Sequence, residues 1–308
     1  MIVRQTPNAF KILFTLRGSV IPHIYPQVLL ITLLSALISA IQHGIPNSFP
    51  SYSTAPFTLL GIALSLFLGF RNNATYQRWW EARGLWGQLV FDARSLTRQL
   101  LSFIDDETEI GRDTQRCMIH LTIAFTHALR HRLRNTSPWE DIERFVEPEY
   151  HDSMRQAGNL PEYLLRLMGK KLGYSRRQHL TSDLMIQNMD ERLTSMTIVL
   201  AACERIHNTP LPFAYILLVH RTTYLYCFML PFSLATSLGW VTPLVCGLIA
   251  YTFFGLDALS EEITDPFGVA ANHLPLTTLS RTIEINLLEA LGETDLPPAI
   301  ISIDGYLE

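Results

Sequence analysis

The chain has 308 residues, of which 48% are hydrophobic and 17% are charged, and its mean hydropathy is positive. The formal net charge of −4 by itself says little about partners, and we expect no nucleic-acid partner. This composition is typical either of a soluble protein with an unusually apolar core or of a protein that lies partly in lipid.

The distribution of charge favours lipid. Residues 18–70 contain no Asp, Glu, Lys or Arg, and residues 206–256 contain only Arg221. A membrane-spanning helix needs about 20 mostly apolar residues, so each stretch is long enough for two crossings and a turn. Segments rich in Pro, Ser and Gly divide both stretches. We therefore predict four transmembrane helices, at about residues 21–43, 54–71, 212–233 and 237–256.

Basic residues indicate the orientation of these helices. They precede the first span and follow the second, whereas the two hairpin turns carry none. By the positive-inside rule, the N-terminus, the middle of the chain and the C-terminus are all cytoplasmic, which predicts a multi-pass protein of the cell inner membrane. No small-residue cleavage pattern follows the first apolar run, so we expect no cleavable signal peptide. The flanking basic residues are Arg4, Lys11, Arg17, Arg71, Arg78 and Arg83.

The segment between the hairpins shows helical periodicity. After the second span, apolar residues recur every three or four positions: Trp86, Leu89, Val90, Ala93, Leu96, Leu100 and Ile104. Similar patterns predict helices at about 113–135, 161–173, 181–208 and 277–292, and no run alternates for long enough to indicate a sheet. We expect an all-α fold with four parts, namely an N-terminal segment and hairpin (1–72), a cytoplasmic helical region (73–208), a second hairpin (209–257) and a cytoplasmic C-terminal segment (258–308).

No catalytic signature is present. The chain lacks the dinucleotide-binding, phosphate-loop, zinc-protease, nucleophile-elbow and EF-hand motifs, so we expect neither an enzyme nor a cofactor or metal site. Its four cysteines have no metal or disulfide spacing and resemble small buried hydrophobic residues.

Two charged segments leave alternatives open. The segment 127–135, with His127 and Arg130 among several basic residues, could bind an anion or line an aqueous cavity, but a solvated helix face is the favoured interpretation. An acidic set that begins at Asp257 could hold a cation, but helix capping is favoured. The other members of this set are Glu261, Glu262 and Asp265.

The second predicted span carries two stripes of side chains. Ile62, Leu66 and Phe70 lie at i, i+4 and i+8 on one face, and a stripe of small residues (Gly61, Ser65 and Gly69) lies about 100° away. Small residues at this spacing let membrane helices approach closely. Either the small stripe is a packing face and the large stripe meets lipid, or the helix stands in a symmetric ring. In the ring, the small stripe contacts a neighbouring subunit and the large residues form hydrophobic collars that gate ions by dewetting.

The continuation of this helix resembles a known family. The segment "FRNNATYQRWWEARGLWG" (70–87) is similar to the signature of the bestrophin family, in which the second membrane helix passes through Asn into R-W-W-E-A-R. The segments "TPLPFAYILLVHRTTYLYCFMLPF" (209–232) and "EEITDPFGVAANHLPL" (261–276) resemble the family's entry into its third span and the segment after its fourth. "GSVIPHIYPQVLL" fits the first helix loosely.

The resemblance implies a homopentameric ion channel in the membrane, with one central pore for monovalent ions and with lipid around it. Ile62, Leu66 and Phe70 become the narrow neck, and Leu184 is the candidate for a second, cytoplasmic aperture. The junction between membrane and cytoplasmic parts falls on residues expected to act through charged pairs and aromatic packing. These are Asn72, Asn73, Trp79, Trp80, Glu81 and Arg83.

Two departures from the family concern the ions. Animal members follow P-F-G with an acidic run that holds calcium, whereas the present "PFGVAANHLPL" has no carboxylate, so no high-affinity calcium gating is expected. Bacterial relatives often have Asp where this chain has His273, which could make conduction depend on pH. Since the resemblance is to the bacterial type, we favour monovalent cations. The alternatives are an anion (chloride) channel of the same family and a non-conducting membrane scaffold or sensor, with a membrane enzyme third.

Overall fold

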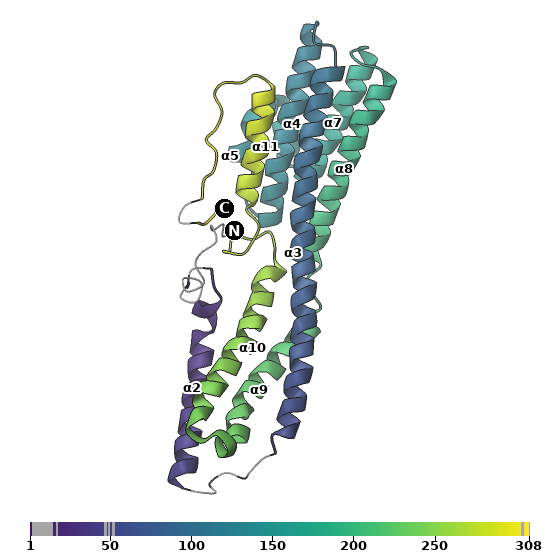
Figure 1. The fold of residues 1–308 in the computed structure, drawn as a ribbon. Helices are drawn as coiled ribbons and strands as arrows, with labels where there is room; N and C mark the ends of the chain where they lie inside the picture. The colour runs from purple at the N-terminus through teal and green to yellow at the C-terminus, as the bar shows by residue number, and fades with distance from the viewer. Residues whose placement is uncertain are drawn as a thin grey trace. The chain divides into compact units, whose positions relative to one another are not determined.

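The structure is a computed structural model that describes residues 1, 15–16, 18–45, 48, 50, 53–302 and 305–307. These residues form helices and no β-strand (Figure 1), which confirms the predicted all-α class. The α-helices are α2 (Ile21–Gly44), α3 (Ala55–Phe103), α4 (Glu109–Arg134), α5 (Trp139–Ile142), α6 (His151–Arg155), α7 (Leu160–Arg177), α8 (Asp183–Asn208), α9 (Phe213–Leu238), α10 (Thr242–Thr264) and α11 (Leu276–Ala290). Three short 3-10 helices are η1 (Glu143–Phe145), η2 (Pro148–Tyr150) and η3 (Gly239–Val241).

The chain divides into two compact units. The apolar unit comprises residues 4–79 and 210–265, and the bundle unit comprises residues 1–3, 80–209 and 266–308. Helix α3 contributes to both, because it is a single helix of 49 residues. The sequence predicted a span at 54–71 and, after it, a helical pattern from Trp86 to Ile104, whereas in the structure no break separates the two.

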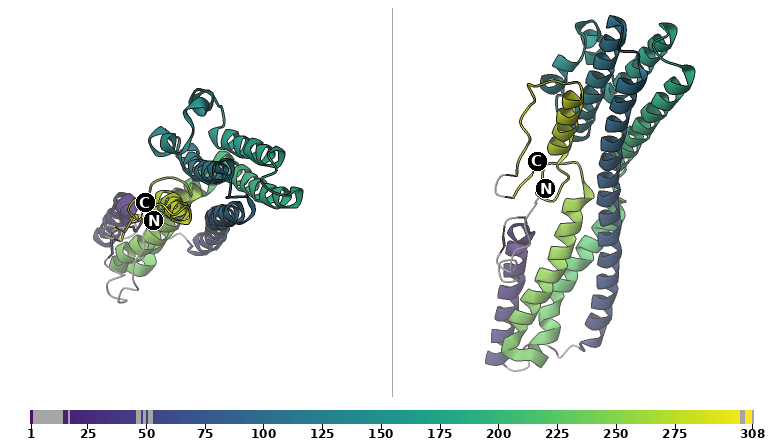
Figure 2. Two further views of the ribbon diagram at one scale, coloured as in Figure 1. Left: turned by 90° about the horizontal axis from the view of Figure 1, so that it is seen from above. Right: turned by 45° about the horizontal axis from the view of Figure 1, so that its top comes forward.

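The apolar unit contains α2, α9, α10 and the first part of α3. By length and composition, α2, α3 and the stretch 213–264 can each cross a membrane. The spans expected at 21–43, 212–233 and 237–256 correspond to α2, α9 and α10, although α10 starts at Thr242 and runs on to Thr264. The span expected at 54–71 is only the first part of α3, which continues to Phe103, and the number of crossings stays a prediction. Helices α2, α9 and α10 lie against one another (Figures 1 and 2). A tight turn joins α9 to α10, and Gly239 occupies a left-handed conformation there (φ +54°), which glycine adopts readily.

The second part of α3 buries one face in the bundle unit, while Phe91, Arg94 and Arg98 on other faces stay exposed. Helices α4, α7 and α8 run side by side, with α11 against α4 (Figures 1 and 2). The predicted apolar stripe of α3 is confirmed, since it is buried from Trp86 to Ile104 except at Val90, which is half-buried. Side-chain caps start α4, α7 and α8: at α4, for example, Thr108 accepts a hydrogen bond from the Gly111 N–H (3.1 Å).

The basic segment at the end of α4 is part of the core of the bundle unit. Only 1% of His127 is exposed, and its Nε2 lies 3.0 Å from Oε2 of Glu284 on α11. The same carboxylate pairs with Arg144 and Arg281. Arg130, also buried, pairs with Asp141. The interpretation as a solvated helix face was wrong, because α5 and α11 cover this end of α4 and bring the partner carboxylates.

These contacts keep both carboxylates ionised. Burial acts to raise the pKa of Glu284, but the hydrogen bond from His127 and the charges of Arg281 and Arg144 outweigh it, so its pKa lies below the ordinary value. The hydrogen bond from His131 is the main reason that the pKa of Asp141 is lowered. A paired carboxylate of this kind stabilises the folded chain at neutral pH.

Replacing Glu284 by Gln tests this network. The change leaves buried His127, half-buried Arg281 and exposed Arg144 without their shared carboxylate, so we expect the free energy of unfolding to fall by about 3 kcal/mol. Glu289→Gln, at an exposed position of the same helix, is the control and should change it by less than about 0.5 kcal/mol. Denaturation of the purified protein in detergent measures both, and equal losses in the two variants would contradict the prediction.

The pH dependence gives a second readout of the same variant. The folded-state pKa of Glu284 is below its ordinary value of 4.5. The contribution of Glu284 to the free energy of unfolding is therefore complete above about pH 4.5, and it is lost as pH falls through the folded-state pKa. The wild-type protein should therefore lose more stability than Glu284→Gln when pH is lowered from 5 towards 3.

Candidate functional site

An exposed apolar row runs along the first part of α3. Ile62, Leu66 and Phe70 are 63%, 55% and 60% exposed in the single chain. On another face of the same helix, Leu64 and Leu68 are almost fully buried and belong to the core that α2, α9 and α10 share. The helix is thus apolar on both faces, but the chain covers only one. The uncovered row needs a non-aqueous surface or a second protein chain beside it.

The stripe of small residues is divided between two environments. Gly61 is buried, and a Cβ atom there would lie 2.6 Å from the Tyr226 hydroxyl, so this glycine permits the close approach of α9 within the same chain. Ser65 and Gly69 are exposed, and nothing lies within 4 Å of a Cβ at Gly69. Only these two positions therefore remain open for the expected contact with a neighbouring subunit.

Polar side chains join α3 to α10 directly after Phe70. Arg71 pairs with Asp257, and the side-chain amide of Asn72 donates to the Leu256 carbonyl (3.2 Å). One turn further on, the hydroxyls of Thr75 and Ser260 lie 3.4 Å apart. Arg78 donates to the Thr264 carbonyl (3.3 Å). We call these contacts the α3–α10 ladder. The contacts recur every three or four residues along α3, so the residues that make them lie on one face of that helix.

The first contact of the ladder is a buried ion pair. Arg71 is 2% exposed and the Asp257 side chain 6%. The second carboxylate oxygen of Asp257 lies 2.7 Å from Nδ1 of the half-exposed His220 on α9, so one carboxylate connects three helices. The capping role expected for Asp257 was wrong, because α10 continues past it to Thr264. The sequence could not reveal the pair, since its members are 186 residues apart.

The residues expected at the junction occupy one run of α3. In the apolar unit, the ring of Trp79 stacks on that of Tyr76, with centroids 6.5 Å apart and planes 17° apart. In the bundle unit, Glu81 pairs with Arg205 of α8 (2.5 Å). The remaining junction residues are Asn72, held in the ladder, Asn73 and Trp80, which are exposed, and Arg83, which is half-buried.

Two further candidate positions lie in the bundle unit. Leu184 is 62% exposed in the first turn of α8, beside an ion pair between Asp183 and Arg176 (2.7 Å). His273 lies in the turn before α11, and its Nδ1 accepts a hydrogen bond from the Ala270 N–H (3.2 Å). The pH dependence expected from His273 stays a prediction. Among the residues that the structure describes, no group of three His, Cys, Asp or Glu could hold a metal ion.

Comparison with known proteins identifies the family. The family model described as "Bacterial/Fungal Bestrophin protein" matches residues 1–289. The chain belongs to the bestrophin family. The resemblance inferred from the R-W-W-E-A-R and D-P-F-G segments is thereby confirmed, and the chain is a membrane protein of an ion-channel family.

Individual relatives agree over nearly the whole chain. The voltage-dependent anion channel-forming protein mll4386 of Mesorhizobium japonicum is 45% identical over 99% of this chain and 96% of its own length. The voltage-dependent anion channel-forming protein YneE of Salmonella typhi is 41% identical, with 99% of both chains covered. A solved bestrophin homologue of Klebsiella pneumoniae is 40% identical and superposes with a TM-score of 0.82, covering 88% of this chain and 99% of that one.

Asp257→Asn tests the ion pair of the ladder. Without its carboxylate partner, buried Arg71 is an uncompensated charge, so we expect a loss of about 3 kcal/mol in the free energy of unfolding. Glu261→Gln, at an exposed position one turn later in α10, is the matched control and should be nearly neutral.

A double variant separates pairing from packing. If the loss arises from the unpaired charge, Arg71→Met combined with Asp257→Asn should be clearly more stable than Asp257→Asn alone. The free energies of unfolding of both single variants and of the double variant are measured by denaturation in detergent. If the loss in the double variant equals the sum of the two single losses, Arg71 and Asp257 are not coupled.

Proposed function

We propose that five copies of this chain form an ion channel with one central pore, and that Ile62, Leu66 and Phe70 of each copy line its neck. The observation that carries the proposal is the exposed apolar row of α3, which lies on a face of the helix that the chain's own core does not use. The family and the match to a solved bestrophin homologue support a channel.

The chemistry of the row suits a gate. A ring of apolar side chains in a narrow passage expels water and so blocks ions, and a small widening restores conduction. The α3–α10 ladder begins at Arg71, the residue after Phe70, and fixes the rotation of α3 at the end of the row. Leu184 is the proposed second constriction, because it is a large apolar side chain left exposed at a helix start.

The protein is proposed to lie in the cell inner membrane, with lipid as its surroundings and both termini cytoplasmic. Of the basic residues that indicate this orientation, Arg4, Lys11 and Arg17 lie outside the described residues. The exposed leucines of α2 offer the lipid-facing surface: Leu30, Leu33 and Leu37 are 64%, 59% and 58% exposed.

The sign of the permeant ion is the open part of the proposal. The neck side chains are uncharged and give no preference, so selectivity depends on charged groups elsewhere along the pathway. The names of the curated relatives favour anions, whereas the sequence predicted monovalent cations. On these names, an anion channel is better supported and a cation channel is the alternative.

Widening the neck tests the channel. Replacing Ile62, Leu66 and Phe70 by Ala removes bulk from the constriction, so we expect single-channel conductance or open probability to rise severalfold. The control carries the same number of changes on α2, at Leu30, Leu33 and Leu37, and should leave the current unchanged. Both are measured with purified protein in planar bilayers. An unchanged current in the neck variant would remove these residues from the pore.

A KCl gradient across the bilayer tests the ion. A reversal potential near the chloride equilibrium potential supports the anion channel, and one near the potassium potential supports the sequence-based prediction of cations. No current from protein shown to be folded and inserted would favour the scaffold or sensor. The reversal potential reports which ion permeates and does not depend on which residues form the neck. This test is therefore independent of the test with the neck variants.

A further inference from the structure

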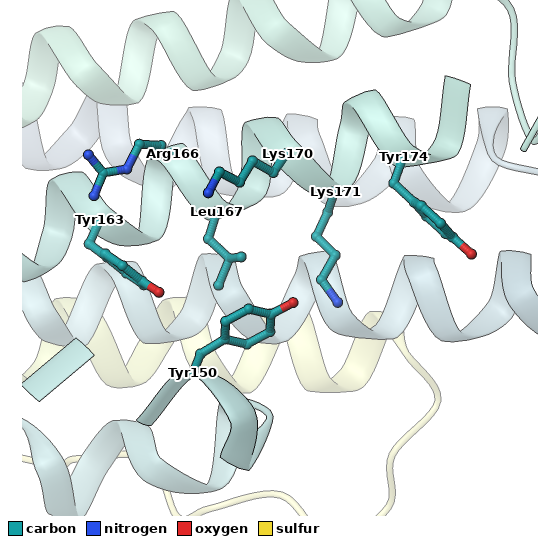
Figure 3. Close-up of a pocket in the computed structure, with 7 residues that line it drawn as sticks. All are labelled: Tyr150, Tyr163, Arg166, Leu167, Lys170, Lys171 and Tyr174. Atoms are coloured by element: carbon teal, nitrogen blue, oxygen red, sulfur yellow. The ribbon is translucent and has the colours of Figure 1, made fainter. Parts of the chain in front are cut away.

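The bundle unit carries a pocket that the proposed pore does not use. It lies along α7, is closed on one side by η2, and has a volume of about 410 Å³, within the range of small-molecule sites. Its lining combines three tyrosines, three cationic side chains and one leucine, and includes no carboxylate (Figure 3): Tyr150, Tyr163, Arg166, Leu167, Lys170, Lys171 and Tyr174.

The cations of the pocket differ in how far they are already neutralised. The Lys171 ammonium lies 2.9 Å from the Glu147 carboxylate. Arg166 is more than half exposed, and its ion pair with Glu162 is long (3.7 Å) and lies at the surface, so it is weak. Lys170 is exposed and makes no ion pair or hydrogen bond within the described part of the chain. The pocket therefore presents at least one uncompensated positive charge at its rim, with Arg166 one helical turn away.

The rest of the lining suits a flat apolar body. Leu167 is 5% exposed and forms the floor, with Tyr150 reaching towards it from η2 and Tyr163 beside it on α7 (Figure 3). The two tyrosine rings already accept cations on their faces, since Arg166 lies 5.4 Å from the Tyr163 centroid and Lys171 5.4 Å from that of Tyr150. These contacts hold the rings in place around the floor.

A covalent role for the pocket is not supported. Cys117 lies near Lys171 and Glu147, but burial raises the pKa of its thiol to about 11, so it is not a thiolate at neutral pH. The Glu147 carboxylate keeps the pKa of Lys171 above its ordinary value although burial acts to lower it, so this amine stays protonated. The pocket has the chemistry of a binding site.

We propose that this pocket binds a small organic anion that joins a flat ring to a phosphate, such as a nucleoside diphosphate. The phosphate contacts Lys170 and Arg166, whose donors are the least committed, and the ring lies over Leu167 between Tyr150 and Tyr163. Charge-assisted hydrogen bonds give the phosphate its affinity, and stacking on tyrosine selects a planar group. The site is independent of the proposed channel function.

Calorimetric titration of the full chain in detergent tests the site, with ADP, adenosine and inorganic phosphate as probes. ADP should bind more tightly than either of the other two, because only ADP uses both parts of the pocket. Lys170→Gln should weaken ADP binding about tenfold, as expected for one lost charge-assisted contact. Tyr163→Leu should weaken ADP by about threefold and leave inorganic phosphate unchanged, since it removes the flat ring but keeps an apolar side chain.

Arg177→Gln is the matched control, because it removes the same charge from an exposed position of the same helix outside the pocket. It should leave ADP binding unchanged. Equal weakening by Lys170→Gln and Arg177→Gln would show only a general effect of charge and would overturn the proposal. So would equal affinity for ADP and inorganic phosphate, or an absence of ADP binding at millimolar concentration.

Discussion

The buried pair between Arg71 and Asp257 is the contact on which the apolar unit depends. A helix that is apolar on two faces can rotate about its axis at little cost in lipid, because either face suits the surroundings. The polar contacts remove that freedom, since only one rotation of α3 brings Arg71, Asn72 and Thr75 onto α10. In that rotation Leu64 and Leu68 enter the core, and Ile62, Leu66 and Phe70 do not. The exposure of the proposed neck is therefore a consequence of the ladder.

The bundle unit also contains a buried charged network that fixes how its helices pack. Glu284 is buried among His127, Arg144 and Arg281, so α4 and α11 can pack in only one register without leaving a charge unpaired. Replacing such a network with apolar side chains could stabilise a fold equally well. Its specific effect is to make the alternative registers costly.

The sequence predicted features that depend on neighbouring residues, and it missed contacts between residues far apart in the chain. Helical periods placed the long helices of the bundle unit and the buried stripe from Trp86 to Ile104, because side chains three or four residues apart share a face in any environment. They did not show that this stripe and the second span form one continuous helix, α3. It failed at His127 and Asp257, whose partners Glu284 and Arg71 are each more than 150 residues away in the chain. For Gly61 it left two alternatives open, and the contact with Tyr226 supports a packing face at that position. Nothing in the spacing of a charged segment says whether a distant carboxylate covers it.

These pairings also bear on the sign of the permeant ion. Asp257 is neutralised by Arg71 and adjoined by His220, Glu284 is surrounded by cations, and the pair of Asp183 with Arg176 beside Leu184 has no net charge. Opposite charges at contact distance produce fields that decay quickly, within about the 8–10 Å over which salt also screens. These paired carboxylates therefore contribute little to ion selectivity. In the proposed ring, selectivity would then rest on exposed charged groups along the pathway, because each such group recurs once in every subunit.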